Sequence, residues 1–426
     1  MRIGDVAHPE RAGSGKPLDG VRVLAAEQMQ ALPYATQLMA HLGADVVKVE
    51  HPVHGESGRG ATPSLTDVDG REVGATFLRN NLGKRSIGLD LKTEEGVELF
   101  RRLVPHFDVV CENFKAGTME RLGLGHGALL EIDPSIIVVS VTGFGVRDDS
   151  PYRSWPAYAP IPEAMAGFYE MNRAADEPPE PLVAGALGDI GSALVAVIGT
   201  LAALRHRDRT GEGQHVDVAM FDTMVAMADL VPFMWSMGAA PFRQGGGGQG
   251  IIAGYRASDG WFVLEVVREH QFDRLAEVIG KPEWRDDLRF ATRQGWDDHG
   301  DEIRSAVESW ASGRTKQEAC FELCAAGVAA GPSNTAADVA ADPHVATRNM
   351  ILEVDRPDSD DPMLVVGNPV KMSNVAEGPL RRFPSLGEHT YEVLDDMLGL
   401  TDSDLDTLAE RGVISPAMAT AVEGRN

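Results

Sequence analysis

The stretch from Pro178 to Asp222 reads PPEPLVAGALGDIGSALVAVIGTLAALRHRDRTGEGQHVDVAMFD, and the rest of the chain is organised around it. A polar, proline-broken loop leads to Asp189, a residue type that can cap a helix. The residues from Ala193 to Leu204 are almost all apolar, so we expect a helix that is buried on most sides. After a basic turn and two glycines, alternation over His215–Met220 predicts a strand.

The composition indicates a globular enzyme. The chain has 426 residues, 43% of them hydrophobic and 24% charged. Its net charge of -25 argues against nucleic acid or an anionic membrane as the main partner. We see no signal peptide and no charge-free apolar run of about 20 residues, so we expect no membrane span. Three cysteines are too few for a disulfide framework, which favours the cytoplasm, and we expect no metal site.

The first part of the chain predicts a parallel βαβ unit. Val21–Ala25 and Asp45–Glu50 are apolar enough for strands, and Tyr34–Leu42 lies between them as a helix. The turn after the first strand, Glu27–Pro33, contains no glycine. Because the dinucleotide fingerprint requires glycines there, we expect no NAD.

Further strands are predicted over Ser86–Leu91, Asp108–Cys111 and Ile136–Val141. Their alternation with helices predicts an α/β fold, with a Rossmann-like parallel-sheet large domain and ligand loops at the carboxyl ends of its strands. A smaller α+β domain follows. The predicted boundaries are an arm at 1–17, the large domain at 18–224, the small domain at 225–330, and a segment at 331–426 that returns to the large domain.

A series of short motifs runs along the chain in a characteristic order. They are Leu42-Gly-Ala-Asp-Val-Val-Lys-Val-Glu50, Gly83-Lys-Arg-Ser-Ile87, Glu112-Asn-Phe114, Arg121-Leu-Gly123, Thr142-Gly-Phe-Gly145, Gly185-Ala-Leu-Gly-Asp189, Thr210-Gly-Glu-Gly-Gln214, the Gly245–Gly248 run and Asp342-Pro-His344. Together they resemble the family III CoA-transferases, which include formyl-CoA:oxalate and carnitine CoA-transferases and the related α-methylacyl-CoA racemases. The resemblance implies an interlocked homodimer.

The resemblance also implies a coenzyme A site, with CoA bound as a thioester substrate. Lys and Arg suit its phosphates. The implied CoA-binding residues are Gln30, Ala31, His51, Lys84, Asn113, Phe114, Lys115, Arg121, Thr142, Gly143, Phe144 and Gly145. His51 stands where relatives often carry Arg, which makes a phosphate contact there weaker or pH-dependent.

The nucleophile implied by the resemblance is Asp176, which stands shortly before Pro178. An ionised carboxylate can attack a thioester to give a mixed anhydride, and CoA can then form an enzyme thioester. Two other carboxylates are alternative candidates for the catalytic carboxylate. Glu163 stands where relatives often carry Gln, and Asp189 matches an Asp that works with an upstream His in the racemases. That upstream position holds Tyr158 here.

The resemblance also assigns a lid to the glycine run Gly245, Gly246, Gly247 and Gly248. Such a run lets backbone approach a thioester and swing away, and it keeps water from an anhydride. We expect the bulky side chains of Trp155, Tyr158, Met234 and Trp235 at the substrate end, and Glu269 near the same cleft.

These observations predict a CoA-transferase that moves CoA from an acyl-CoA to a carboxylic acid. The alternatives are an acyl-CoA isomerase or racemase of the α-methylacyl-CoA type, and a CoA-binding protein whose catalytic carboxylate has drifted. Racemization needs two acid/base groups, and Tyr158 in place of His disfavours it.

Overall fold

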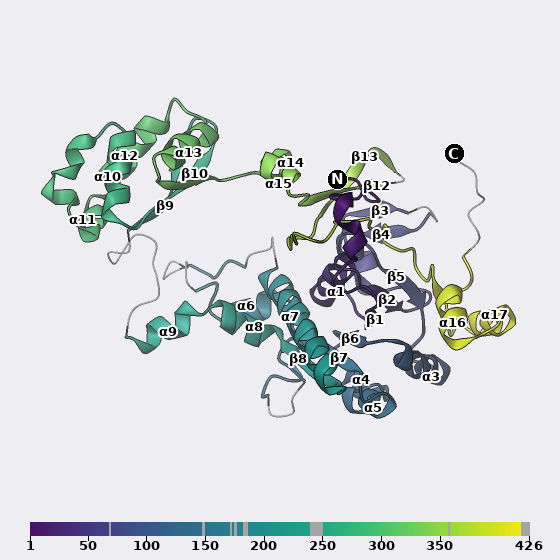
Figure 1. Ribbon diagram of the computed structural model, residues 1–426. Coiled ribbons are helices and arrows are strands. Elements are labelled where there is room, and N and C mark those ends of the chain that lie inside the picture. Colours follow the sequence, from purple (N-terminus) through teal and green to yellow (C-terminus); the bar gives the residue numbers. More distant parts are fainter. Residues whose placement is uncertain are drawn as a thin grey trace. The chain divides into compact units, whose positions relative to one another are not determined.

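The computed structural model describes residues 1–67, 70–146, 150–170, 173, 177–181, 186–238, 250–356 and 358–418. The chain divides into two compact units (Figure 1). Unit 1 is Met1–Phe168, Glu180–Asp229 and His344–Asn426, and unit 2 is Tyr169–Pro179 and Leu230–Pro343. The arm at 1–17 and the domain boundaries at 224 and 330 stay predictions.

Unit 1 is built on a six-stranded parallel sheet in the order β5-β2-β1-β6-β7-β8. Its strands are β1 (Arg22–Ala26), β2 (Asp45–Glu50), β5 (Arg85–Gly88), β6 (Val109–Glu112), β7 (Ile137–Thr142) and β8 (Gln214–Ala219). Most of their residues are buried, as expected for a parallel sheet covered on both faces. The chain passes from β1 outward to β2 and β5, then returns to place β6 on the other side of β1. The strand order therefore reverses between β1 and β6.

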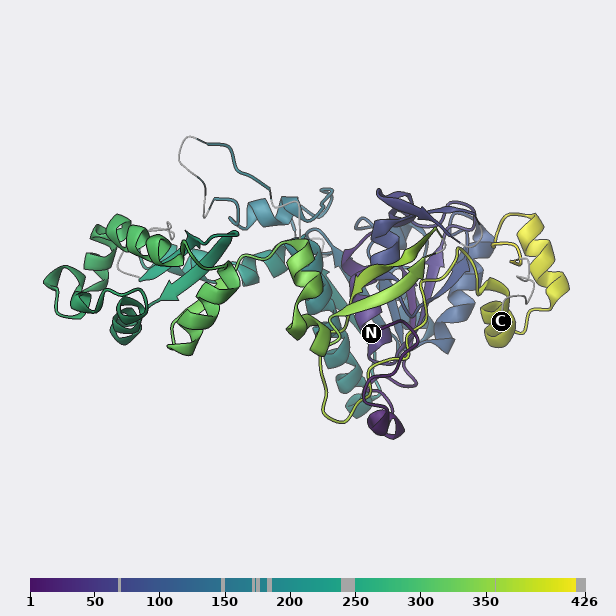
Figure 2. The ribbon, with the colours of Figure 1, turned by 90° about the horizontal axis from the view of Figure 1, so that it is seen from above.

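Helices cover both faces of this sheet (Figures 1 and 2). On one face, α1 (Ala31–His41) and α7 (Leu187–Thr210) pack on alternate strand residues such as Val23 and Val139. On the other face, α3 (Glu94–Leu103), α5 (His126–Ile132), α16 (Thr390–Leu398) and α17 (Asp402–Glu410) pack on residues such as Val110 and Val138. The predicted α/β class is thus confirmed.

The central helix α7 differs from its prediction in two ways. First, its N-cap residue is Ala186, with a φ of 37°, and not Asp189, which lies in the first turn. Second, the helix is not buried on most sides: Ile198 is 66% exposed and Leu194 is 44% exposed in the single chain. Its small residues, such as Ala193 and Ala196, face the sheet instead. The helix is long and apolar enough to cross a membrane by length and composition alone, which the sequence did not lead us to expect.

Unit 2 is a smaller α+β unit. Its antiparallel sheet has the order β11-β10-β9, from β9 (Ile251–Arg256), β10 (Trp261–Val266) and β11 (Ala329–Pro332). The helices α10 (Glu269–Val278), α11 (Arg293–Asp298), α12 (Gly300–Ala311) and α13 (Lys316–Ala325) complete its core, in which Phe272 stacks on Trp296.

The boundary between the two units falls between two helices, α8 (Met220–Met227) in unit 1 and α9 (Leu230–Ser236) in unit 2. The remaining helices and strands of the described chain are β3 (Ser64–Thr66), β4 (Glu72–Gly74), α2 (Ala75–Asn80), α4 (Thr118–Arg121), α6 (Pro160–Met165), α14 (Ala336–Ala341), α15 (Pro343–Thr347), β12 (Ile351–Arg356), β13 (Ser359–Val366) and the 3-10 helices η1 (Pro9–Ser14), η2 (Ser57–Gly60), η3 (Val104–His106), η4 (Pro282–Arg285) and η5 (Leu288–Phe290).

Candidate active site

A cavity of about 260 Å³ opens at the carboxyl ends of the central strands of unit 1. The loops after β1, β6 and β7 and the first residue after β8 line it, so it spans the point where the strand order reverses. Ligands of open α/β sheets bind at that place. The cavity brings together these residues expected from the sequence: Gln30, Ala31, Asn113, Phe114, Lys115, Thr142, Gly143, Trp155, Tyr158 and Asp189.

Asn113 ties two walls of this cavity together. Its Oδ1 accepts a hydrogen bond from the backbone N–H of Gln28 at 2.9 Å, and its Nδ2 donates to the carbonyl of Gln28 at 2.9 Å. The next residue, Met29, has a φ of 63°, a left-handed conformation that is unusual for a non-glycine residue. Glu56 supports it, because its Oε2 accepts from the Met29 N–H at 2.9 Å. The β1–α1 loop is therefore held in one shape without glycine.

Gln30 is oriented by a residue that the sequence did not single out. The Arg79 guanidinium of α2 donates to Gln30 Oε1 at 2.7 Å. Lys115 is the exposed cation of the lining, and the structure gives it no ion pair within the described residues. Thr142 Oγ1 is buried in the cavity wall and has no hydrogen-bond partner among the described residues.

Lys84 is not at the cavity, and its expected phosphate contact is not supported. Its side chain is fully buried, and its Nζ donates to Glu27 Oε1 at 2.6 Å, to Asn81 Oδ1 at 2.8 Å and to the Pro33 carbonyl at 2.9 Å. Lys48 also contacts Glu27, at 3.5 Å. Burial lowers the pKa of Lys84 to about 8, although Glu27 opposes the shift. Lys84 thus neutralises a buried carboxylate beneath the β1–α1 loop.

Four further expected residues also lie outside the cavity lining. His51 stacks on His54 with ring centroids 4.8 Å apart, and its Nδ1 accepts from two backbone N–H groups. The exposed Arg121 donates to Thr118 Oγ1 at 2.9 Å. Phe144 packs in an aromatic cluster next to the cavity residue Trp155, and Gly145 follows it with a φ of 82°. Asp176 and the glycine run Gly245–Gly248 lie outside the described residues.

Asp189 and Glu163 form a pair of carboxyls at the start of α7. Glu163 is buried, and its Oε1 accepts the Gly188 N–H at 2.8 Å, so Glu163 supplies a helix-capping contact. Asp189 lines the cavity instead. Burial and the charge of Glu163 raise the pKa of Asp189 to about 6, and Arg79 partly opposes this. Tyr158, at the racemase His position, is 71% exposed at the cavity rim.

Comparison with known proteins shows the family to which this chain belongs. Residues 18–390 match the family model described as CoA-transferase family III. The chain belongs to CoA-transferase family III. It is 37% identical to the succinyl-CoA:mesaconate CoA-transferase of Haloarcula marismortui over 389 residues, which cover 89% of this chain and 96% of that protein. It is 36% identical to the succinyl-CoA–D-citramalate CoA-transferase of Chloroflexus aurantiacus, with 94% and 98% of the two chains covered.

A solved structure agrees. The crystal structure of a CAIB/BAIF family protein from Brucella suis matches with a TM-score of 0.79 and 34% identity, over 90% of this chain and 99% of that chain. The resemblance found from the sequence motifs is confirmed. This family III CoA-transferase transfers CoA between acyl-CoA thioesters and acids, and CoA thioesters are its substrates.

Glu112 supports the cavity from behind its lining, and the sequence did not single it out as a site residue. Its Oε2 accepts the N–H of Phe114 at 2.9 Å and so shapes the turn that presents Asn113 and Phe114 to the cavity. Burial raises the pKa of Glu112 to about 7, while hydrogen bonds from Ser140 and Phe114 oppose the shift. Its place directly before Asn113 in the Glu112-Asn-Phe114 motif was the available signal.

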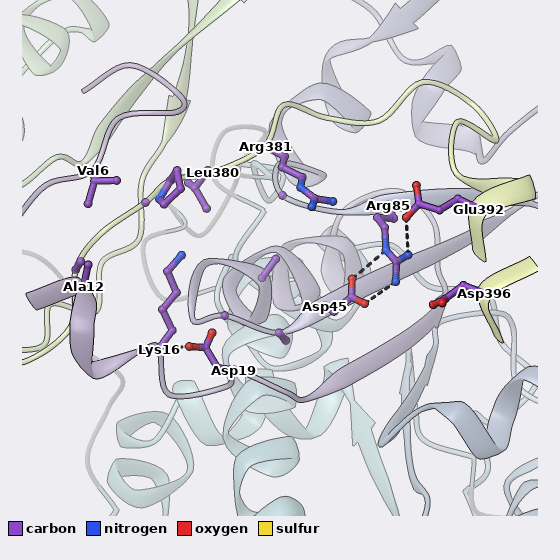
Figure 3. Close-up of a pocket in the computed structure, with 18 residues that line it drawn as sticks. Val6, Ala12, Lys16, Asp19, Asp45, Arg85, Leu380, Arg381, Glu392 and Asp396 are labelled. Carbon is purple, nitrogen blue, oxygen red and sulfur yellow. Dashed lines mark hydrogen bonds and ion pairs between the residues drawn. The ribbon is translucent and has the colours of Figure 1, made fainter. Parts of the chain in front are cut away.

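Another cavity, of about 650 Å³, lies at the amino ends of the strands of unit 1, beside the first residues of β2 and β5 (Figure 3). Arg85 forms ion pairs there with Asp45 at 2.5 Å and with Glu392 at 3.1 Å. Lys16 and Arg381 extend toward its interior, but Asp19, Asp45, Glu392 and Asp396 also line it. The carboxylates outnumber the basic groups, so this cavity is a poor site for the phosphates of CoA. Within the described residues, no three His, Cys, Asp or Glu side chains are grouped to hold a metal ion.

Proposed function

We propose that this family III enzyme transfers CoA from an acyl-CoA to a dicarboxylic acid through the carboxylate of Asp176. The observation that carries the proposal is the cavity at the strand-order reversal, which gathers Gln30, Asn113 and Lys115 in a chain of this family. The names of two relatives support dicarboxylic acids, since mesaconate and citramalate both carry two carboxyl groups.

In the proposed route, each bond that breaks is matched by one that forms, and charge is conserved. The Asp176 carboxylate attacks the thioester carbonyl, the C–S bond breaks, and a mixed anhydride and CoA thiolate result. The thiolate attacks the aspartyl carbonyl of the anhydride, which releases the donor acid and leaves an enzyme–CoA thioester. The acceptor carboxylate then attacks this thioester, and the freed thiolate attacks the acceptor's acyl carbon. The new acyl-CoA leaves, and Asp176 is again a carboxylate.

Lys115 and Asn113 have distinct parts in this proposal. Lys115, an exposed cation of the lining, binds a phosphate of CoA, and Asn113 holds the cavity walls. The run Gly245–Gly248 closes over the acyl-enzyme. Tyr158 stands at the position where the related racemases carry a His. This disfavours the isomerase route, which needs a second acid/base group.

The proposal includes self-association as a homodimer and a reducing, cytoplasmic location. The apolar face of α7 supports the first: Leu194, Val195, Ile198 and Leu201 are between 38% and 66% exposed. A contiguous apolar face of this kind marks an interaction site, and a second copy of the chain would cover it. Three free cysteines support the second.

A panel assay tests the proposed function. Acetyl-, succinyl- and formyl-CoA are each incubated with mesaconate, citramalate, malate, oxalate, glutarate and acetate, and new CoA thioesters are read by mass spectrometry. We expect transfer to dicarboxylic acids at least tenfold faster than transfer to acetate. Transfer to acetate alone would contradict the dicarboxylic acid proposal, and transfer to no acid would contradict the whole.

A further inference from the structure

The inference concerns Asp189 and rests on the proposed function. Asp189 stands in the first turn of α7 and lines the cavity in which the transfer is proposed to occur. Its side chain is not used as a helix cap, because Ala186 is the N-cap residue and Glu163 accepts the Gly188 N–H. Within the described part of the chain, the Asp189 carboxyl has no hydrogen bond or ion pair. It is therefore available to a ligand.

The surroundings of Asp189 make its uncharged form more accessible than that of an ordinary aspartate. Glu163, buried in α6, contributes a second carboxyl, and partial burial removes some of the water around Asp189. These effects raise the pKa of Asp189 to about 6, and the Arg79 guanidinium opposes them without cancelling them. Titratable and charged groups also stand on the cavity wall and on the helices that pack on α7. They are Lys115, Arg153 and Tyr158 of the wall, Tyr34 of α1, and Asp222 of α8.

The proposed reaction brings another carboxylate into this cavity. The acceptor acid must reach the enzyme–CoA thioester as an anion, because only its ionised oxygen is nucleophilic. An ionised Asp189 in a partly buried cavity would repel that anion. A protonated Asp189 would instead donate its O–H to one carboxylate oxygen and leave the other free to attack.

We propose that Asp189 binds the acceptor acid in its protonated form, as a hydrogen-bond donor that selects and orients the acceptor carboxylate. The proton stays on Asp189 throughout, so the step adds no acid and no base to the reaction. Asp189 is then a substrate-contacting specificity residue and not the nucleophile. The same carboxyl, once ionised, excludes the acceptor.

The experiment measures kcat and KM for the acceptor acid between pH 5.5 and 8, with the most active acid of the panel and saturating donor. Saturating donor matters because the phosphate of CoA titrates in the same range. Asp189→Asn keeps a neutral hydrogen-bond donor that cannot ionise, and Asp189→Leu keeps the size without a donor. Asp208→Asn, at the exposed end of the same helix, is the control for loss of an α7 carboxylate.

In the wild type and in Asp208→Asn, we expect kcat/KM for the acceptor to fall roughly tenfold per pH unit above pH 7, through KM. In Asp189→Asn we expect a low KM that does not change with pH. In Asp189→Leu we expect a KM at least tenfold higher at every pH. The proposal is overturned if Asp189→Asn keeps the wild-type slope, or if it is as impaired as Asp189→Leu at pH 6. Absence of transfer by the wild type at every pH would instead overturn the proposed function, and this inference with it.

Discussion

The side chain of Asn113 makes two hydrogen bonds to the backbone of Gln28, one as acceptor and one as donor, each 2.9 Å long. Gln28 follows β1 and Asn113 follows β6, and these are the neighbouring strands between which the strand order reverses. One amide therefore joins two loops that form walls of the cavity at this reversal.

Replacing Asn113 with alanine removes both hydrogen bonds and leaves the Gln28 N–H without its partner. We expect the free energy of unfolding to fall by about 1–3 kcal/mol. We also expect the Kd for CoA to rise at least tenfold, because the cavity walls lose their common anchor. Asn113→Asp keeps the acceptor but not the donor, so its CoA affinity should lie between that of the wild type and that of Asn113→Ala. Urea unfolding and calorimetric titration with CoA check this. Unchanged CoA affinity in Asn113→Ala would refute the anchoring role.

Two lysines are expected to affect different properties of the enzyme, Lys84 its stability and Lys115 its affinity for CoA. Lys84→Met leaves the buried Glu27 without its closest cation and should cost about 3–5 kcal/mol of stability. Lys115→Ala removes an exposed cation from the cavity rim. It should leave stability nearly unchanged, raise the Kd for CoA severalfold and weaken the salt dependence of CoA binding.

These two variants are compared by urea unfolding and by CoA titration at two salt concentrations. If Lys84→Met folds poorly, Lys84→Arg keeps a cation at Glu27 and reports CoA affinity alone; we expect it to bind CoA as the wild type does. A Lys115→Ala variant with wild-type CoA affinity would remove Lys115 from the phosphate site.

The pKa of Glu112 gives the stability a predictable pH dependence. Its pKa is raised from 4.5 to about 7 in the folded chain, so between these values the folded state holds a proton that the unfolded state has lost. This group's contribution to stability therefore falls as the pH rises from 4.5 to 7, by about 3 kcal/mol in total. Glu112→Gln removes this contribution.

The comparison is urea unfolding at pH 5 and pH 8. Glu112→Gln should be more stable than the wild type at pH 8 and should lose less stability between the two values. Glu98→Gln, an exposed carboxylate on α3, should follow the wild type. If wild type and Glu112→Gln show the same change between pH 5 and pH 8, Glu112 is not the titrating group.

The exposed face of α7 predicts the oligomeric state. Ile198 is 66% exposed in the single chain. A glutamate there should cost little in an isolated chain but should prevent a second copy from covering the face. We expect a homodimer for the wild type and for Arg205→Glu, and a monomer for Ile198→Glu, by light scattering after gel filtration. A monomeric wild type would contradict the homodimer proposal.

The backbone pattern of this enzyme could be predicted from its sequence, and the partners of its charged groups could not. The strand Asp45–Glu50 was predicted with the bounds that β2 has, because apolar runs and their spacing determine strands locally. The ion pair of Lys84 with Glu27 was not predicted because the two residues are distant in sequence, and only the fold brings them together. The cap expected at Asp189 belongs to Ala186, whose φ of 37° the residue type does not predict.

The exposed apolar face of α7 shows a second limit of prediction from sequence. An apolar run indicates burial but not which molecule provides the cover, so Ile198 was expected to be inside a single chain. Seven of the twelve expected CoA residues lie in the cavity lining. Glu112 and Arg79 went unnoticed because each acts through a neighbour, Phe114 in one case and Gln30 in the other.

The central claim is that CoA passes through a covalent thioester on Asp176, and one measurement tests it most directly. The enzyme is incubated with the donor acyl-CoA alone, treated with hydroxylamine or borohydride, digested and analysed by mass spectrometry. A parallel sample in deuterated water reports exchange of the substrate's α-hydrogen. We predict a trapped adduct on the peptide that contains Asp176, none in Asp176→Asn, and no deuterium in the substrate. Deuterium in the substrate without an acceptor acid, with no adduct on that peptide, would contradict the transferase route through Asp176 and favour the isomerase.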